Sequence, residues 1–497
     1  MKVRALLASV LFLFILTFVS CSKQNVSESG STSTTTGWDY NNPENGGYEV
    51  VQKYEPQTGP GLVFIEGGSF TMGRVEQDVM YDWNNVPRRV TVSSFYMDET
   101  EVRNVDYREY LNWIRRVFAN YPEVYKNALP DTLVWRRPLA YNEPYVQYYF
   151  RHPAYNEYPV VGVNWLQAND YCSWRTDRVN EKLLIDKGIL QWNPNQLDND
   201  NFNTDAYLAG QYEGLVGKNL PSLDPNAEER KVRLEDGILL PKYRLPTEAE
   251  WEFAAFGLIG NTYDERIYER RIYPWNGHNV RNDQKKVRGE MRANFVRGRG
   301  DMMGTAGRLN DNADITAPVK SYWPNDYGLY CMAGNVNEWV LDVYRPLSFE
   351  DVQEFRPYRG NVFEELVRDE EGNVAAKDSL GRLRWKEVDP NNAAGRTNYT
   401  KANYINYLDG DKMSSTSFNQ EDADDKPGSG RMYSRDTDDP FRASLIGDDV
   451  RVYKGGSWRD RAYWLSPGTR RFLKETQSAD DLGFRCAMTR VGSPAGN

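Results

Sequence analysis

The segment that most constrains the fold lies near the C-terminus, between residues 451 and 488. It opens with an Arg-Val-Tyr-Lys run and then passes through Gly455 and Gly456 into Ser457 and Trp458. β-Branched and aromatic residues favour a strand, and adjacent glycines let the backbone turn where a side chain would clash. Trp458 follows the turn at once and supplies a large apolar surface. The pattern predicts a strand, a tight turn and an indole anchored in a core.

The composition limits the class of protein. With 497 residues, the chain is long enough to bury a large core and, by length alone, to form more than one domain. The formal net charge of -10 argues against a nucleic-acid partner, which normally meets a basic surface. The local exception is the arginine-rich stretch 292–308, which we interpret as a solvated loop.

The N-terminus has the features of a targeting segment. Lys2 and Arg4 precede an apolar run at residues 5–19, which is too short for a membrane span. The Ser20-Cys21 junction resembles a bacterial lipobox, although Phe18 replaces the usual leucine. We expect a lipoprotein signal peptide at 1–20 and a lipid anchor on Cys21; an ordinary secretory signal is the alternative.

The residues after Cys21 predict a tether rather than a fold. The stretch 21–58 is rich in Ser, Thr, Gly, Asn and Pro and has few apolar side chains. Such a segment cannot offset the entropy lost on ordering, so we expect a flexible linker. The linker does not begin with an acidic cluster, and we therefore expect the protein to face the periplasm.

Periodicity predicts several regular elements. The apolar run 62–65 and the alternating stretch 90–97 indicate strands. A helix is expected from Asn104 to about Arg116, because four apolar residues fall on one face. These residues are Tyr107, Tyr110, Leu111 and Ile114.

Further elements follow along the chain. A helix is expected at 166–179 and a hairpin around Glu371-Gly372-Asn373. The Thr-x-x-Glu pattern from Thr247 to Glu250 follows a proline and predicts a helix N-terminus with a capping box. The residues expected on the core side of that helix are Trp251, Phe253, Ala254 and Ala255.

Four motifs resemble those of the formylglycine-generating-enzyme family, the sulfatase-modifying fold. They are Arg-Leu-Pro-Thr-Glu-Ala-Glu-Trp-Glu at 244–252, Tyr-Gly-Leu-Tyr-Cys-Met-Ala-Gly-Asn-Val-Asn-Glu-Trp at 327–339, Gly-Gly-Ser-Trp at 455–458 and Gly-Phe-Arg-Cys at 483–486. The resemblance implies a loop-rich α+β fold similar to C-type lectins. It covers residues 59–490 as one domain, with insertions at about 180–241 and 344–449.

The resemblance also raises the question of copper oxidase chemistry. In the family, two cysteines after the Gly-Gly-Ser motif bind copper, and the matching positions here are Asp460 and Leu465. Copper(I) selects soft thiolates, so we expect no copper and no enzyme. The alternative is an active oxidase with a rebuilt site. The chain has only His152 and His278, which excludes a three-histidine iron centre.

The resemblance implies a disulfide and a calcium ion. The contexts of Cys172 and Cys486 match two positions that the family joins, and an exported chain meets an oxidising compartment. The family's first calcium site uses two side-chain oxygens and two carbonyls, which map to Asn294, Asp311, Phe295 and Ala313. A metal-free loop held by Asx turns is the alternative. A second family site would fall on Cys331, Gly334, Val336 and Glu338, and we expect it to be weak or empty.

Within the superfamily, the sequences at 73–80, 82–85 and 97–101 resemble those of the gliding-motility lipoproteins. That resemblance implies an outer-membrane lipoprotein of the Bacteroidetes type IX secretion and gliding machinery. Its partners would be other lipoproteins and periplasmic subunits of that machinery, and a lectin-like glycan or peptidoglycan binder is the alternative. We expect the insertions to form the partner surface, with hot-spot residue types at Tyr358, Arg359, Tyr399, Tyr404, Tyr407 and Arg431.

Overall fold

The structure is a computed structural model of the whole chain. It describes residues 32–51, 54, 56–74, 84–224, 226–268, 271–298, 313–344, 354–355, 357–362, 364–388 and 449–492. The contacts divide the chain into two compact units. Unit 1 contains 1–55, 183–191 and 215–239, and unit 2 contains 56–182, 192–214 and 240–497.

Unit 1 has little regular structure. Strand β5 (Leu220–Pro221) pairs with β6 (Glu229–Arg230), and two 3₁₀ turns are formed by η1 (Pro43–Asn45) and η5 (Leu234–Asp236). Arg230 forms ion pairs with Glu49 and with Asp236, the latter at 2.7 Å. These charge pairs connect the N-terminal part of the unit with the first expected insertion.

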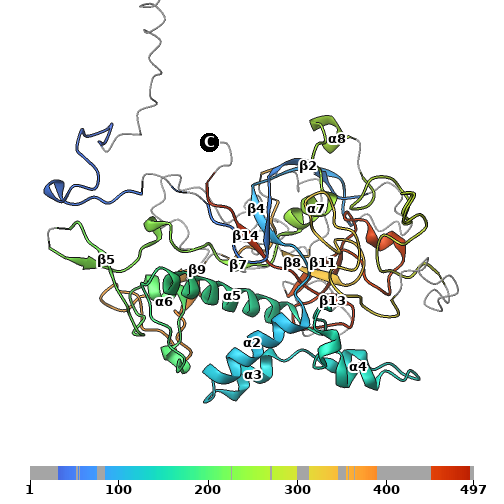
Figure 1. Ribbon diagram of the computed structural model, residues 1–497, viewed down its shortest axis with the longest axis horizontal. Helices are drawn as coiled ribbons and strands as arrows, with labels where there is room; N and C mark the ends of the chain where they lie inside the picture. The colour runs from blue at the N-terminus through green and yellow to red at the C-terminus, as the bar shows by residue number, and fades with distance from the viewer. Residues whose placement is uncertain are drawn as a thin grey trace, which may run out of the picture. The chain divides into compact units, whose positions relative to one another are not determined.

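Unit 2 contains two four-stranded sheets (Figure 1). The first has the order β1-β4-β14-β7 and is antiparallel throughout. The second has the order β12-β11-β8-β13, in which β13 runs parallel to β8. Their bounds are β1 (Leu62–Ile65), β4 (Phe95–Asp98), β7 (Tyr243–Arg244), β8 (Asn337–Val343), β11 (Val450–Lys454), β12 (Arg471–Lys474), β13 (Leu482–Gly483) and β14 (Ala487–Thr489). Two-stranded sheets are formed by β2 (Gly68–Met72) with β3 (Arg88–Val92) and by β9 (Glu364–Leu366) with β10 (Trp385–Glu387).

The expected strand at 90–97 is in fact two strands. Strand β3 pairs with β2, whereas β4 joins the sheet of β1 and β14. The break falls at Ser93 and Ser94, where the Ser94 hydroxyl accepts a hydrogen bond from the Gly67 amide at 3.0 Å. This side-chain contact offers the backbone an alternative to continued pairing, and the chain changes sheet there.

The described helices include the three expected from the sequence. They are α2 (Asn104–Val117), α3 (Pro122–Ala128), α4 (Glu143–Tyr148), α5 (Trp165–Asp186), α6 (Thr204–Leu208), α7 (Glu248–Phe256) and α8 (Tyr263–Ile267). Short 3₁₀ turns are η2 (Thr132–Trp135), η3 (Pro153–Tyr155), η4 (Asp198–Asp200) and η10 (Ala462–Leu465). The predicted helix from Asn104 is confirmed, and its four expected core residues are buried. Helix α5 extends past the predicted residue 179 and ends before Gly188, whose φ of 72° is left-handed.

None of the described helices is both long and apolar enough to cross a bilayer. The predicted hairpin around Gly372 is a tight turn: the Asp369 amide donates to the Asn373 carbonyl, and a bridge joins Arg368 to Val374.

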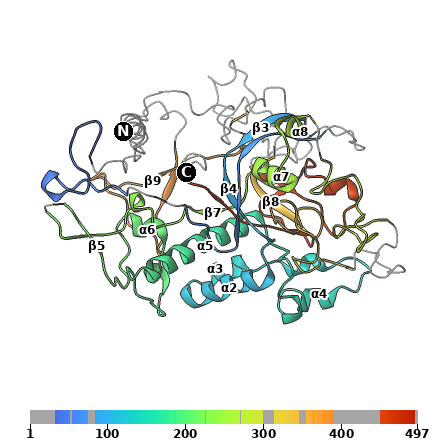
Figure 2. The same ribbon diagram turned by 45° about the horizontal axis from the view of Figure 1, so that its top comes forward.

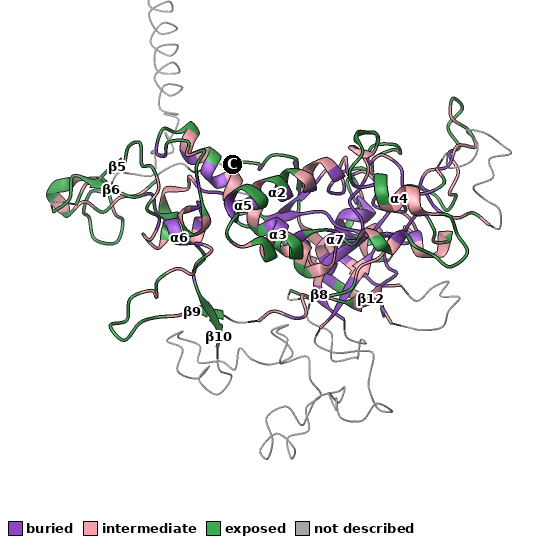
Figure 3. Cartoon of the chain, turned by 90° about the horizontal axis from the view of Figure 1, so that it is seen from below, coloured by how far each residue is buried: buried purple, intermediate pink, exposed green. Residues whose placement is uncertain are grey.

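Helix α7 lies at the centre of the main core of unit 2 (Figure 2). The predicted capping box is confirmed, because Thr247 Oγ accepts from the Glu250 amide and Glu250 returns a contact to the Thr247 amide. The helix packs against β2, β3, β8 and β11. Colouring by burial shows that β8 is buried, whereas β9 and β10 are largely exposed (Figure 3).

The core also contains a buried ion cluster. Lys454 Nζ lies 2.9 Å from Glu252 and 3.2 Å from Glu248, and Arg470 lies 3.0 Å from Glu248. All four side chains are almost completely inaccessible to solvent. A buried charge is tolerated when it is paired and hydrogen-bonded, so the two cations and the two carboxylates of this cluster offset one another's charge.

Candidate functional site

The turn after β11 has the geometry that its sequence predicts. Gly455 and Gly456 both have positive φ, at 103° and 71°. A β-carbon at Gly456 would lie 2.8 Å from the carbonyl oxygen of Trp464, so glycine is required there. The indole of Trp458 is buried and stacks on Trp135, with ring centroids 6.2 Å apart. The turn therefore presents the next residues, including Asp460, at a fixed position.

Asp460, the first of the two family copper positions, is held in a polar network. Arg471 donates to both of its carboxylate oxygens, at 2.9 and 2.7 Å. Ser457 donates its amide and its hydroxyl, at 2.9 and 2.6 Å, and Asn337 donates at 3.3 Å. The guanidinium of Arg471 also lies over the Trp464 ring, 4.4 Å from its centroid. Both oxygens of Asp460 are thus engaged within the protein.

The electrostatics of Asp460 favour a permanent carboxylate. Burial by itself would raise the pKa of Asp460, but the hydrogen bonds and charge of Arg471 outweigh it and hold that pKa below its usual value. Ser457 and Asn337 act in the same direction. An ionised carboxylate paired with a guanidinium is a structural group here, and it carries no thiol chemistry.

Leu465, the second family copper position, is part of the core. Its side chain is completely buried in an apolar cluster with Met291, Ala293, Phe295 and Ala333. A hydrocarbon side chain offers no ligand atom, and the carboxylate of Asp460 is a hard oxygen donor that Arg471 already neutralises. The residues at these positions therefore do not fit a copper ion.

Two aspartates complete the network, and nothing in the sequence pattern had singled them out. The Asp481 carboxylate lies 2.9 Å from the Ser457 hydroxyl oxygen and accepts from Asn337 at 3.2 Å, and burial raises the pKa of Asp481. Asp480 forms ion pairs with Arg459 and with Arg137. Since Arg137 lies 343 residues away in the chain, only its place in the fold reveals the contact.

The expected first calcium site is only partly within the described residues. The Asn294 side-chain nitrogen donates to the Ile315 carbonyl at 2.9 Å and to Asn335 at 3.3 Å. Because the side-chain nitrogen of Asn294 donates within the protein, its side-chain oxygen is the atom that would bind a cation. An oxygen ligand fits an all-oxygen calcium site. Asp311 lies outside the described residues. Calcium at Asn294, Phe295, Asp311 and Ala313 stays a prediction.

The expected second site contains an engaged carboxylate. Glu338 accepts from Arg485 at 2.6 Å on each oxygen and from the Trp251 indole at 2.7 Å. The Cys331 thiol lies 3.4 Å from the carbonyl oxygen of Val319. Within the described residues, no three His, Cys, Asp or Glu side chains are grouped to hold a metal ion. Because Arg485 donates to both of its oxygens, the carboxylate of Glu338 is committed to a salt bridge.

The structure brings together the two cysteines that the resemblance pairs. The sulfur atoms of Cys172 and Cys486 lie 3.4 Å apart, and both side chains are buried. Cys172 belongs to α5, and Cys486 precedes β14 directly. The structure holds both as thiols, at a separation from which a small sulfur movement would form the bond. The disulfide stays a prediction, and Cys21 lies outside the described residues.

We expect protein matured outside the cytoplasm to contain the Cys172–Cys486 disulfide. Replacing Cys486 with alanine should then lower the free energy of unfolding by about 2–5 kcal/mol, because the cross-link restricts the unfolded chain. Peptide mass mapping under non-reducing conditions would identify the linked peptides, and urea denaturation would give the stability change.

Cys331→Ala is the matched control, because Cys331 is buried but belongs to no expected pair. Equal unfolding midpoints for the wild type with and without a reductant that reaches the buried pair would contradict the disulfide.

Comparisons with known proteins identify similar chains. The family model described as sulfatase-modifying factor enzyme 1-like domain matches residues 47–490. Mouse formylglycine-generating enzyme is 28% identical over 283 residues, which is 56% of this chain and 58% of that protein. Mouse inactive C-alpha-formylglycine-generating enzyme 2 is 26% identical over 325 residues, covering 61% of this chain and 73% of that protein.

Other relatives differ in length and in kind. A protein named serine/threonine-protein kinase pkn1 from Chlamydia pneumoniae is 27% identical over 304 residues, or 60% of this chain and 30% of that one. The solved structure of PvdO from Pseudomonas aeruginosa aligns over 88% of this chain and all of its own, with a TM-score of 0.41 and 14% identity. The family model covers most of the sequence, and its match confirms the expected formylglycine-generating-enzyme fold, with mixed helices and strands joined by loops. The chain belongs to the sulfatase-modifying factor enzyme 1-like domain family.

Proposed function

We propose that this chain is a non-catalytic outer-membrane lipoprotein of the type IX secretion and gliding-motility machinery. The sequences at 73–80, 82–85 and 97–101 support a GldJ-like role, and the alternative is a role like that of the sister lipoprotein GldK, also called PorK. In this role the two insertions would provide the interaction surface for other lipoproteins and periplasmic subunits of the machinery. Curated relatives include both a formylglycine-generating enzyme and a protein named as inactive.

One observation carries the non-catalytic part of the proposal. The position of the first family cysteine is Asp460, whose oxygens are occupied by Arg471 and Ser457. The position of the second is Leu465, which is completely buried. A site that lacks both thiolates has neither the ligands for copper(I) nor the sulfur nucleophile for an exchange with a substrate cysteine.

The remaining parts of the proposal concern location and cofactor. The lipid on Cys21 would hold the domain at the outer membrane, facing the periplasm. Part of the expected linker 21–58 is packed rather than free, because Glu49 pairs with Arg230 and accepts a hydrogen bond from the Leu223 amide within unit 1. Calcium would be a structural ion bound by Asn294 and its expected co-ligands, and it supplies no redox chemistry. The acidic composition supports the absence of a nucleic-acid partner.

We expect purified, copper-treated protein to leave a sulfatase-type cysteine peptide unchanged. Neither Asp460 nor Leu465 can replace a thiolate, so no formylglycine should form. Aldehyde-specific labelling and peptide mass would measure the product, with mouse formylglycine-generating enzyme as the positive control. Turnover by this protein would refute the non-catalytic proposal.

The same chain should be released from the membrane, or fail to mature, when Cys21 is replaced with alanine. A Cys331→Ala chain, in which the buried thiol changes instead, should fractionate like the wild type. The secretion role is tested in the same strains: a Cys21→Ala allele that supports full secretion and gliding would contradict it.

A further inference from the structure

Several largely buried arginines in unit 2 share one arrangement, in which the guanidinium pairs with a carboxylate and also lies over an aromatic ring. Three of these carboxylate–arginine–ring sets are Asp460–Arg471–Trp464, Asp98–Arg175–Tyr243 and Glu181–Arg178–Trp113. The guanidinium-to-centroid distances are 4.4, 4.5 and 4.3 Å respectively. A planar cation is well suited to this environment, because it donates along its edge and stacks through its face.

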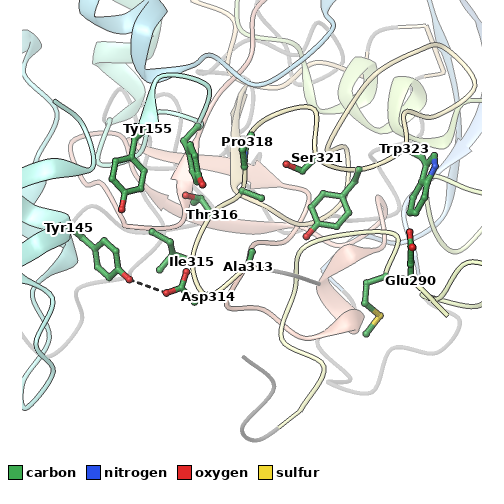
Figure 4. Close-up of a pocket in the computed structure, with 14 residues that line it drawn as sticks. Tyr145, Tyr155, Glu290, Ala313, Asp314, Ile315, Thr316, Pro318, Ser321 and Trp323 are labelled. Atoms are coloured by element: carbon green, nitrogen blue, oxygen red, sulfur yellow. Dashed lines mark hydrogen bonds between the residues drawn. The ribbon is translucent and has the colours of Figure 1, made fainter. Parts of the chain in front are cut away.

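A pocket in the same unit offers these partners without the arginine. Its volume is about 430 Å³, and its aromatic lining residues are Tyr145, Tyr155, Tyr158, Tyr322 and Trp323. Figure 4 shows Asp314 beside Tyr145 at one side of the pocket. Glu290 and Trp323 both line the pocket and appear at its other side in this view.

The charges of this pocket are not balanced by any lining residue. Asp314 accepts a hydrogen bond from the Tyr145 hydroxyl at 3.1 Å, and neither Asp314 nor Glu290 forms an ion pair with a described residue. No lysine or arginine is among the residues that line the pocket in the described part of the chain. Burial, followed by the charge of Asp314, raises the pKa of Tyr145 to about 12, so its hydroxyl remains a donor at neutral pH. The pocket is therefore an aromatic cavity with negative charge at two sides.

We infer that this pocket binds an arginine side chain of a partner polypeptide. A guanidinium entering it would find a carboxylate for a charge-assisted hydrogen bond and a ring for stacking, as the three internal arginines do. Lysine fits less well, because its compact ammonium cannot stack through a planar face. A neutral sugar could stack on the rings, but it would leave both carboxylates without a countercharge.

The inference does not depend on the secretion role. The pocket is built by residues 145–158, 290–291 and 313–323, and none of these is Asp460 or Leu465. If the protein did not bind arginine, the non-catalytic proposal would be unaffected. If it produced formylglycine, the inference that the pocket binds arginine would be unaffected.

The test uses the blocked tripeptide acetyl-Gly-Arg-Gly-amide as the probe. Ligand-observed NMR titration of the purified full chain would give its dissociation constant, with the citrulline tripeptide as a neutral isostere and the lysine tripeptide for comparison. We expect the arginine tripeptide to bind at least about tenfold more tightly than the citrulline tripeptide, because the two side chains have nearly the same shape and only arginine can make a charge-assisted hydrogen bond. The arginine tripeptide should also bind more tightly than the lysine tripeptide.

Variants assign that binding to the pocket. Asp314→Asn and Glu290→Gln should each weaken arginine binding by about tenfold, since each removes one charge and keeps the shape. Glu371→Gln is the matched control, because Glu371 is an exposed carboxylate on the turn that follows β9. Thermal unfolding at the wild-type temperature would show that each variant is folded.

Three results would overturn the inference. Arginine and citrulline could bind equally, or the two pocket variants could bind arginine as the wild type does. Saturable binding of an N-acetylglucosamine oligomer, with no saturable binding of the arginine tripeptide, would instead assign the pocket to a glycan.

Discussion

Replacing Arg485 with methionine is expected to lower the free energy of unfolding by about 3–5 kcal/mol. The guanidinium is completely buried and donates to both oxygens of Glu338 at 2.6 Å. It also donates to the carbonyl oxygens of Asp98 and Tyr330, at 3.1 and 2.8 Å. Methionine fills much of the same volume but leaves the Glu338 carboxylate buried and without its countercharge. Urea denaturation monitored by tryptophan fluorescence would measure the loss.

The control is Arg288→Met, which changes an exposed arginine in the same unit. It should alter the free energy of unfolding by no more than about 0.5 kcal/mol, as is usual for surface positions. If the two variants were equally stable, the Arg485–Glu338 pair would not stabilise the fold as argued.

The Arg485–Glu338 pair shows why the C-terminal motif is informative. Gly483 belongs to β13, which pairs with β8, and Ala487 begins β14, which pairs with β4 in the other sheet. The short segment between them crosses from one sheet to the other, and Arg485 is located at that crossing. The four-residue motif therefore indicates both sheets, because its arginine contacts Glu338 of β8 and the carbonyl oxygen of Asp98 in β4.

Sequence patterns predicted the features that depend on local residues. The helix from Asn104, its buried face and the capping box at Thr247 follow from periodicity and from residues three or four apart. The turn at Gly456 was also predictable, because positive φ and close backbone contact leave only glycine. These signals are contained in a few consecutive residues and do not require knowledge of the fold.

Other features depend on contacts between distant segments, and the sequence did not show them. The strand pattern at 90–97 is continuous, yet Ser94 interrupts it through a contact with Gly67, which the pattern cannot register. The network around Asp460 requires Asn337 and Asp481, which approach only when β8 and β13 pair. The aromatic pocket is assembled from three separate segments in the same way. Each of these features follows from tertiary pairing and not from propensity.

Glu101 is a buried acid whose ionisation should affect stability. One carboxylate oxygen accepts from the Asn335 amide at 2.9 Å, and the other has no hydrogen-bond partner. Burial and then the charge of Glu338 raise the pKa of Glu101 to about 8, against the weaker opposing effects of Arg485 and Asn335. The folded protein therefore holds a proton on Glu101 at a pH where the unfolded chain has released it.

Replacing Glu101 with glutamine should remove a pH dependence of stability. In the wild type, the proton on Glu101 stabilises the folded state fully below pH 4.5, and that stabilisation is lost as the pH rises to about 8. Glutamine resembles the protonated acid at every pH. The variant should therefore gain stability relative to the wild type by up to about 1.4 kcal/mol for each pH unit in this window. Urea denaturation at about pH 5, 6, 7 and 8 would give the free energy of unfolding of both proteins and hence the difference between them.

The difference between the two proteins isolates Glu101 from other groups that titrate in the same range, such as Asp342, whose pKa burial raises to about 7. Glu109→Gln changes an exposed carboxyl on the adjacent helix α2, and its stability should run parallel to that of the wild type. If the Glu101→Gln curve were also parallel, Glu101 would not be protonated in the folded state. The buried pair Glu101 and Glu338 would then both be charged, and Arg485 would have to neutralise two carboxylates rather than one.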